Sequence, residues 1–138
     1  MERTLVLLKP DSVSKKHIGD IIKIYEENDC TVAAMKLMKM DARLASIHYQ
    51  EHIGRPYYEE LVSFMTSGPI VALVLEGDDV IRRVRALNGK TNPAEADEGT
   101  IRRLYAESKS INAVHASDSP ESAEREVHIF FNETEILD

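Results

Sequence analysis

The sequence predicts a single α+β domain built on a four-stranded antiparallel sheet with helices on one face. Strand-like and helix-like segments alternate in two tandem strand–helix–strand units. The length of 138 residues suits one domain, which would bury roughly two-thirds of the surface of the unfolded chain. The composition, 43% hydrophobic and 30% charged, is typical of globular proteins. This order fits the split-βαβ, ferredoxin-like plan over residues 1–138, and a flavodoxin-like parallel sheet is the competing topology.

The N-terminal part is expected to form two strands around one helix. The run "TLVLLKP" (Thr4–Pro10) is short, apolar and ended by a proline, as in a buried strand. The following helix is indicated by apolar residues at i, i+3, i+4 and i+7, which are Ile18, Ile21, Ile22 and Tyr25. The run "CTVAAMKLMKM" (Cys30–Met40) suits a second strand, although its methionines and alanines also suit a helix.

Two short helices and the clearest strand of the chain are expected next. Asp41 can cap the first helix, and Pro56 can stand in the first turn of the second. The apolar sides of these helices carry Leu44, Ile47 and His48, and Tyr57, Tyr58, Leu61, Val62 and Met65, respectively. The run "GPIVALVLEG" (Gly68–Gly77) is almost continuously apolar and predicts a buried strand.

The last third is expected to contain two main helices with a short helix and a short strand between them. Asp78 or Asp79 caps the first helix, and Asn88–Gly89 ends it. The segments in between are a loop over Lys90–Gly99, a short helix in "GTIRRLYAES" and a strand at "INAVH" (Ile111–His115). Ser119 caps the final helix, with Pro120 at its first position.

The formal net charge of −7 argues against a general nucleic-acid-binding protein, because a phosphate backbone favours a basic face. A local cluster of cations could still bind a small anion. The single cysteine, Cys30, has no partner for an internal disulfide, which favours a cytoplasmic location. The N-terminal apolar run is too short for a signal peptide, and no run approaches the length of a membrane span.

The segment "NAVHASDSPESAE" places His115 where an expected strand ends and a helix begins. Such junctions carry reactive groups in many α/β folds, and a neutral imidazole can act as a nucleophile through a covalent intermediate. A partly buried histidine bonded to nearby backbone is the alternative, and for an isolated segment it is the more common case.

The residues after His115 could orient its ring or accept a proton from it. The "SDSP" stretch forms a strong helix start, whose free backbone N–H groups can hold an anion or orient the histidine. Glu126 lies about two helical turns further on and could accept a proton from one imidazole nitrogen, leaving the other free to attack. By spacing alone, Glu121 and Glu124 could do the same.

Three cations from separate segments could together form an anion pocket. Lys9 ends the first expected strand, Arg85 lies in the helix before "NGKTNP", and Arg102 lies in "GTIRR". Guanidinium groups match the geometry of phosphate oxygens, although a surface salt bridge is the more common role of any single cation. Thr91 could be a simple turn residue or a polar ligand.

Several catalytic and metal-binding motifs do not occur in the sequence. It contains no GxxxxGK[ST] loop, no GxGxxG after a strand, no HExxH and no Cys/His metal pattern. The other histidines have no metal-ligand spacing and are interpreted as surface or packing residues, namely His17, His48, His52 and His128. Tyr57 and Tyr58 lie on an apolar helix face, where packing is expected, although an exposed ring could stack on a nucleobase.

In order along the chain, "ERTLVLLKPD", "RPYYEELVSFMTSGP", "TNP", "GTIR" and "NAVHASDSPESAE" resemble the nucleoside diphosphate kinases, almost from end to end. The resemblance implies an enzyme that moves the γ-phosphate of a nucleoside triphosphate, typically ATP, to a nucleoside diphosphate in two half-reactions through a phosphohistidine. It also implies Mg²⁺ carried by the nucleotide phosphates rather than by the protein, and a homo-oligomer, either a hexamer or a tetramer.

The resemblance also implies roles for individual residues. His115 matches the phosphorylated histidine, Glu126 the glutamate bonded to the other ring nitrogen, and Ser117 a serine that supports this glutamate. Tyr49 matches a tyrosine close to the histidine and to the lysine of "KPD", and Tyr57 stands where the family usually has a phenylalanine stacked on the base. The residues that match phosphate and ribose contacts are Lys9, Arg85, Thr91, Arg102 and Asn112.

Three features depart from the family pattern. Ala116 replaces a glycine that is often found after the histidine. Arg103 and Leu104 stand where many members have a small and an acidic residue, so an additional cation lies beside Arg102. The sequence stops at Asp138 without the C-terminal extension of many eukaryotic members, which leaves the choice between hexamer and tetramer open.

Two other functions are compatible with parts of the sequence. A catalytically silent binding module would keep the pocket for nucleotide sensing or for a protein partner, but the presence of His115, Lys9 and Arg102 disfavours it. A nucleic-acid-binding side activity is disfavoured by the acidic charge balance.

Overall fold

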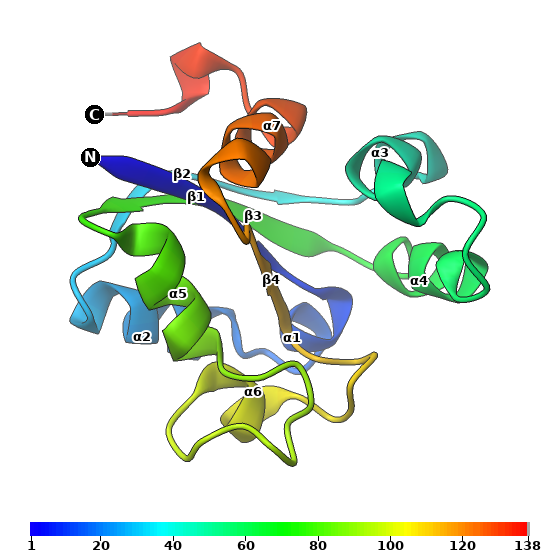
Figure 1. The fold of residues 1–138 in the computed structure, drawn as a ribbon, viewed down its shortest axis with the longest axis horizontal. Coiled ribbons are helices and arrows are strands. Elements are labelled where there is room, and N and C mark those ends of the chain that lie inside the picture. Colours follow the sequence, from blue (N-terminus) through cyan, green and yellow to red (C-terminus); the bar gives the residue numbers. More distant parts are fainter. Residues whose placement is uncertain (138) are drawn as a thin grey trace.

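The fold is described from a computed structural model that defines residues 1–137 (Figure 1). In chain order the elements are β1 (Glu2–Leu8), α1 (Pro10–Ser14), α2 (Ile18–Glu27), β2 (Thr31–Met38), α3 (Ala42–His48), η1 (Gln50–His52), α4 (Tyr58–Met65), β3 (Ile70–Gly77), α5 (Val80–Asn88), α6 (Ile101–Tyr105), β4 (Val114–Ala116), α7 (Pro120–Phe130) and η2 (Glu133–Glu135). All expected strands and helices are present in the expected order, and α1 and the two short 3-10 helices η1 and η2 are additional.

The sheet has the strand order β2-β3-β1-β4, and every neighbouring pair is antiparallel. The central strand β1 pairs Leu7 with Ala72 of β3 on one side and with His115 of β4 on the other. Because β3 lies between β1 and β2, each strand–helix–strand unit is split by a strand of the other unit. The predicted ferredoxin-like plan is therefore confirmed, and the alternative of a parallel sheet is wrong.

Helices cover both faces of the sheet, so the expectation of helices on one face is wrong. Successive residues of β1 point to opposite faces, and all of Leu5–Leu8 are fully buried. Leu5 and Leu7 pack with α3, α4 and α7, whereas Val6 and Leu8 pack with α2, α5 and α6 (Figure 1). A strand without polar alternation is typical of burial on both faces, and this property of β1 and β3 explains the difference.

Most predicted helix ends are present, with two exceptions, at the starts of α4 and α5. Pro56 was expected in the first turn of α4, but Tyr57 is the N-cap and the helix begins at Tyr58, so Pro56 lies just before it. The Asp41 carboxylate accepts a hydrogen bond from a backbone N–H of the first turn of α3 at 2.8 Å, and Ser119 Oγ does so for α7 at 3.1 Å. Gly89 ends α5 with a φ of +84°. The start of α5 differs, because Asp79 has a φ of +54° and its carboxylate accepts from Arg82 instead of capping the helix.

Two strand boundaries near His115 and Lys9 differ from the prediction. β1 ends at Leu8 and Pro10 begins α1, in agreement with the preference of proline for the first position of a helix. β4 spans only Val114–Ala116, not Ile111–His115. His115 therefore lies inside the strand and opposite β1, and not at the end of the strand.

Two remaining expectations concern the membrane and the cysteine. Within residues 1–137 we find no helix with the length and apolar character needed to cross a bilayer. Cys30 is buried directly before β2, where its Sγ lies 3.8 Å from Nη1 of Arg83.

Candidate active site

Three adjoining cavities surround β4 and the segment before it. Their volumes are about 870, 340 and 130 Å³. Their walls include, respectively, Arg85, Thr91 and Arg102; Lys9, Tyr57 and Asn112; and Tyr49, His115 and Glu126. Lys109 lines the first two cavities, and Ala116 lines the first and the third. The structure thus gathers the site residues expected from the sequence into one region, with Ser117 buried directly behind it.

A chain of hydrogen bonds fixes His115 of β4 relative to α7. Nε2 of His115 lies 2.8 Å from Oε1 of Glu126, and the same oxygen accepts a 2.8 Å bond from Ser117 Oγ. Ser117 Oγ in turn accepts a bond from the backbone N–H of Leu5 in β1 at 3.2 Å. When Glu126 is ionised, Nε2 carries the proton and Nδ1 holds a free lone pair. Nδ1 has no hydrogen-bond partner among the described residues.

The Glu126 carboxyl group remains ionised although it is buried. Burial acts to raise its pKa, but the hydrogen bond and charge of His115, together with the bond from Ser117, hold the pKa below its usual range. Glu124, one of the alternatives offered by spacing, lies instead 3.6 Å from Nδ1 of His128. Among the three glutamates of α7 considered from the sequence, Glu126 is the one bonded to the histidine.

The ring of His48 packs edge-on against His115, and Phe130 packs in turn on His48. The ring centre of His48 lies 4.9 Å from that of His115 with the planes at 84°, and Phe130 packs on His48 at 5.2 Å. His48 is 5% exposed, and neither ring nitrogen has a partner in the described part of the chain. Burial, followed by the charge of His115, lowers the pKa of His48 to about 3, so the ring is neutral at pH 7. His48 packs, as expected, but its contact with His115 was not predicted.

The hydroxyl of Tyr49 is buried in the same region without a partner among residues 1–137. Burial, followed by the charge of Glu126, raises the pKa of Tyr49, so that the group is an uncharged O–H donor at neutral pH. A buried hydroxyl without a partner costs about 1–3 kcal/mol. A ligand that enters this cavity can provide the missing acceptor.

Lys9 is a buried cation at the end of β1. Its side chain is 8% exposed, and Nζ donates a 2.7 Å hydrogen bond to Oδ1 of Asn112. Burial, followed by the charge of Arg102, lowers the pKa of Lys9 to about 8, and the charge of Asp11 opposes this shift. The ammonium group is therefore charged at pH 7 but poorly solvated, a state that strengthens its attraction for an entering anion.

Arg102 of α6 is held by backbone carbonyls from two segments. It donates from Nη1 to Gly89 at 3.0 Å, from Nη2 to Val114 at 2.8 Å and from Nε to Asn112 at 3.3 Å. The guanidinium group is thus fixed between the loop after α5 and the segment that leads into β4. Because carbonyls carry no net charge, the positive charge of Arg102 remains available to a ligand.

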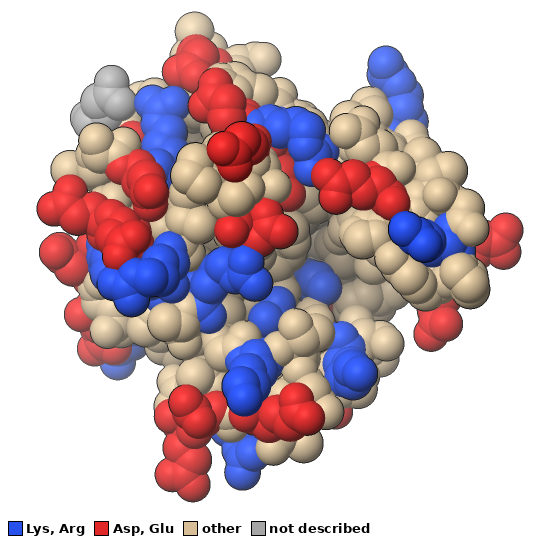
Figure 2. All heavy atoms as spheres, viewed as in Figure 1, with Lys and Arg blue, Asp and Glu red and all other residues tan. Residues whose placement is uncertain are grey.

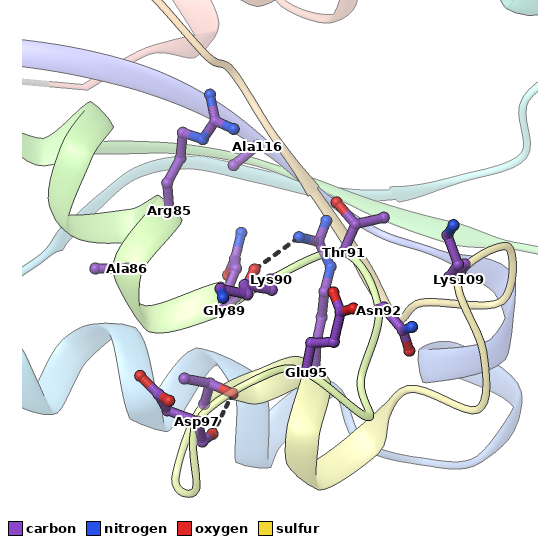
Figure 3. Close-up of a pocket in the computed structure, with 13 residues that line it drawn as sticks. Arg85, Ala86, Gly89, Lys90, Thr91, Asn92, Glu95, Asp97, Lys109 and Ala116 are labelled. Atoms are coloured by element: carbon purple, nitrogen blue, oxygen red, sulfur yellow. Dashed lines mark hydrogen bonds between the residues drawn. The ribbon is translucent and has the colours of Figure 1, made fainter.

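The largest cavity has cationic and polar residues along its walls. Figure 3 shows Arg85 reaching from α5 toward Ala116 on β4, with Lys90 and Thr91 on the loop that follows α5. Among residues 1–137, the one hydrogen bond of Arg85 is long, 3.5 Å from Nη1 to the backbone carbonyl of Asp118. The side chain is therefore lightly held and can turn toward an anion in the cavity.

The segment between Asn112 and Val114 forms a strained turn. Ala113 has a φ of +74°, and Val114 N donates to the carbonyl of Asn112 at 2.8 Å, which defines a γ-turn of the rare type with positive φ. For a residue with a Cβ, such strain costs about 1–3 kcal/mol and persists only where the surroundings fix it. The turn directs the Asn112 side chain toward Lys9 and the flanking carbonyls toward Arg102.

Tyr57 offers a half-exposed ring at the second cavity. It lies at the N-cap of α4, is 48% exposed, and its hydroxyl lies 2.6 Å from Nδ1 of His52. This bond restrains the ring beside Lys9 and Asn112, where its flat apolar face can receive a ligand. Tyr58, in contrast, packs against the hydrophobic core.

The structure also places two residues that depart from the family pattern. Arg103 donates to the carbonyls of Pro93 and Ala94 at 3.5 and 3.3 Å, so it braces the loop after α5. The methyl group of Ala116 lies where the first and third cavities adjoin.

Four polar residues of this region were not predicted as site residues. Besides His48, they are Asp11 and Ser12, which bond to Ala113, and Arg125, whose Nη2 lies 3.7 Å from Oε2 of Glu126. Each reaches the site through tertiary packing, and no spacing in the sequence signals it. The one available signal was the "KPDS" stretch, in which two polar residues follow a buried strand and a proline.

Positive charge gathers around the site although the chain is acidic overall. Figure 2 shows Lys and Arg side chains around a hollow between the α3–α4 pair and the α6 region, with Asp and Glu side chains prominent elsewhere on this face. Such a local field attracts small polyanions even when the net charge is −7.

The described residues do not form a protein-based metal centre. Within residues 1–137, no three His, Cys, Asp or Glu side chains gather in a way that could hold a metal ion. A Mg²⁺ ion bound by phosphate oxygens and water needs no such group, since this ion keeps much of its hydration shell.

Comparison with known proteins identifies relatives over nearly the full length. The family model described as "Nucleoside diphosphate kinase" matches residues 2–136. A protein of this name from Listeria innocua is 53% identical over 137 residues, covering 99% of this chain and 93% of the relative. Another from Methanocaldococcus jannaschii is 51% identical, covering 99% of this chain and 98% of the relative.

Solved structures with the same fold carry the same family name. The nucleoside diphosphate kinase of Aquifex aeolicus superposes with a TM-score of 0.96 at 42% identity and covers 99% of both chains. That of Halobacterium salinarum, solved in complex with CDP, also has a TM-score of 0.96 at 42% identity, covering 99% of this chain and 91% of its own.

The neutral, buried state of His48 predicts a specific dependence of stability on pH. The unfolded chain binds a proton at His48 near pH 6.5, whereas the folded chain does so only near pH 3. The stability gained by keeping this ring neutral is therefore present above pH 6.5 and lost as the pH falls toward 3. Urea unfolding should show that the wild type loses up to about 1.4 kcal/mol per pH unit more than His48→Phe over this range.

His128 provides a control of opposite sign. A hydrogen bond to Glu133, followed by one to the carbonyl of Glu124, raises the pKa of His128, so this group stabilises the folded chain on the acidic side. His128→Phe should therefore lose more stability on acidification than the wild type does. Parallel pH profiles of the wild type and His48→Phe would contradict the assignment of His48 as a buried neutral ring.

Proposed function

Because this chain belongs to the nucleoside diphosphate kinase family and is therefore a phosphotransferase, we propose that His115 is the residue that carries the phosphate. The γ-phosphate of a nucleoside triphosphate, typically ATP, is moved to His115 and then to a nucleoside diphosphate. The observation that carries the proposal is the 2.8 Å contact of Nε2 with Glu126, which leaves Nδ1 free at the 130 Å³ cavity.

The proposed chemical step uses the free nitrogen as the nucleophile. The Nδ1 lone pair attacks the γ-phosphorus, the bond from this phosphorus to the β–γ bridging oxygen breaks, and the nucleoside diphosphate leaves with that electron pair. The ring becomes positively charged, its proton stays on Nε2, and the Glu126 carboxylate stabilises it. The second half-reaction reverses these steps with the acceptor diphosphate in the same site.

We propose that the two larger cavities bind the nucleotide. Phosphoryl transfer depends mainly on positioning and on neutralising the phosphate charge, and Lys9, Arg85 and Arg102 supply this charge. Thr91 and Asn112 provide polar contacts to phosphate or ribose, and Tyr57 stacks on the base. The CDP complex of the Halobacterium salinarum relative supports a nucleotide ligand. A stacking ring reads no hydrogen-bond pattern of the base, so we expect broad base specificity.

Ser117 and Tyr49 complete the proposed catalytic group. Ser117 holds Glu126 in place through its 2.8 Å bond, and Tyr49 offers its unpaired hydroxyl to the γ-phosphate. Mg²⁺ is proposed to enter as part of the nucleotide substrate, bound by phosphate oxygens. It neutralises phosphate charge there, in addition to the cations of the protein.

We further propose a homo-oligomer, either a hexamer or a tetramer, in the cytoplasm. β2 is an edge strand, and its exposed Met35 and Leu37 support association through an apolar surface. The lone buried Cys30 supports a reducing compartment. The acidic charge balance speaks against a specific nucleic-acid partner.

The central test is labelling with γ-³²P-ATP and Mg²⁺. We expect the wild type to acquire an acid-labile label that any nucleoside diphosphate removes, because phosphohistidine is unstable in acid. His115→Gln should acquire none, whereas His17→Gln, in a histidine away from the cavities, should label normally. Acid-stable label, or label retained in His115→Gln, would show that another residue carries the phosphate.

The lowered pKa of Lys9 predicts an alkaline limit of activity. As the pH rises through about 8, Lys9 of the free enzyme loses its charge, so kcat/KM for the nucleotide should fall. In the complex, bound phosphates favour the charged ammonium, so kcat should fall only at higher pH.

The matched variant for this prediction is Lys9→Arg, whose guanidinium stays charged. A poorer fit should lower its absolute activity, but its kcat/KM should lack the decline near pH 8. An unchanged decline in Lys9→Arg would assign the alkaline limit to another group.

A further inference from the structure

We infer that Asp11 is a positioning residue for this phosphoryl transfer, because it holds Ala113 in the strained turn that orients the phosphate-binding side chains. Ser12 takes part in the same contact. The inference rests on the proposed function, since it concerns how the same site is built. Neither side chain lines the three cavities, so both act through the turn.

Both polar groups of the Ala113 backbone are bonded to Lys9, which joins β1 to α1, or to the first turn of α1. The Ala113 N–H donates to Oδ2 of Asp11 at 3.1 Å. The Ala113 carbonyl accepts from Ser12 Oγ at 2.8 Å and from the backbone N–H of Lys9 at 2.9 Å. Residues about a hundred positions before Ala113 in the sequence thus fix its backbone conformation.

The burial of the Asp11 carboxylate lowers the stability of the fold, so a contribution to stability alone does not explain its position. Asp11 is 6% exposed and Ser12 is 1% exposed. The second carboxylate oxygen of Asp11, Oδ1, has no hydrogen-bond partner among residues 1–137. A half-paired buried carboxylate beside a strained residue is the combination expected where function fixes a conformation.

The turn connects these contacts to the cations of the site. If Ala113 relaxed to a negative φ, the Asn112 side chain would leave Nζ of Lys9, and the carbonyls on either side of Ala113 would leave Arg102. His115 follows two residues later and would shift relative to Glu126. A displacement of about 1 Å in such a site can lower the rate roughly 100-fold.

Single-turnover phosphorylation of His115 with saturating ATP and Mg²⁺ tests the inference. Asp11→Ala should lower the rate about tenfold, whereas Asp11→Asn, whose amide oxygen can accept the same bond, should stay within about threefold of the wild type. Ala113→Gly added to Asp11→Ala should restore the rate to within about threefold, because glycine adopts positive φ without a Cβ penalty.

Two single variants serve as controls. Ala113→Gly alone should stay within about twofold of the wild type, because the bonds from Asp11 and Ser12 still hold the turn. Ser14→Ala removes a hydroxyl of the same helix that bonds to the Asp11 carbonyl and not to Ala113, and it should also stay within about twofold. Thermal unfolding of each variant shows that folded protein is compared.

The outcomes separate the inference from the proposed function. A normal rate in Asp11→Ala, a loss that Ala113→Gly does not restore, or equal losses in Asp11→Ala and Asp11→Asn would overturn the inference. The last result would mean that the charge beside Lys9 matters, and not the bond to Ala113. If Asp11→Ala does not fold, Ser12→Ala replaces it, with an expected loss of about threefold that Ala113→Gly reverses. Absence of phosphohistidine in the wild type would contradict the proposed function instead.

Discussion

One hydrogen bond, between Nε2 of His115 and Oε1 of Glu126, determines what the rest of the site can do. At 2.8 Å it selects the tautomer, orients the ring and leaves Nδ1 as the free nitrogen. It also joins β4 to α7, which packs across one face of the sheet. Through Ser117 the contact extends to the backbone of Leu5 in the central strand, so the position of the imidazole is set by the core of the fold.

Around this contact, the cations Lys9 and Arg102 are hydrogen-bonded to uncharged oxygens. Lys9 is bonded to an amide oxygen and Arg102 to three carbonyls, so neither of these hydrogen-bonded contacts pairs the cation with a carboxylate. Such buried charges reduce the stability of the free enzyme, and a bound polyphosphate provides the missing negative charge. The strain at Ala113 belongs to the same arrangement, because the turn aims the oxygens that hold both cations. Stability is thus reduced locally in favour of a preorganised phosphate site.

Signals within a few residues predicted most helices and strands. The contacts between side chains at the site depend on tertiary packing, which such signals do not describe. Apolar runs identified β1 and β3, and the Ser119–Pro120 pair identified the start of α7, because these features act within a few residues. The sequence analysis predicts helices on one face of the sheet. This is wrong, although the continuous apolar run of β1 is typical of a strand buried on both faces. By helical spacing alone, Glu121, Glu124 and Glu126 were equally able to bond to His115. The packing of α7 on the sheet places Glu126 at the histidine. The contact of His48 with His115 and that of Asp11 with Ala113 form only when distant segments meet, so no spacing in the sequence predicts them, and the "KPDS" stretch is the one local signal near Asp11.

The most direct test of the central hydrogen bond is NMR spectroscopy of the enzyme phosphorylated by ATP, with histidine labelled with ¹⁵N. Coupling between ³¹P and ¹⁵N identifies the nitrogen that carries the phosphate. We predict coupling to Nδ1 of His115 and a proton retained on Nε2, because Glu126 holds that side of the ring. Coupling to Nε2 would contradict this arrangement, since the phosphate would then occupy the position of the bond to Glu126.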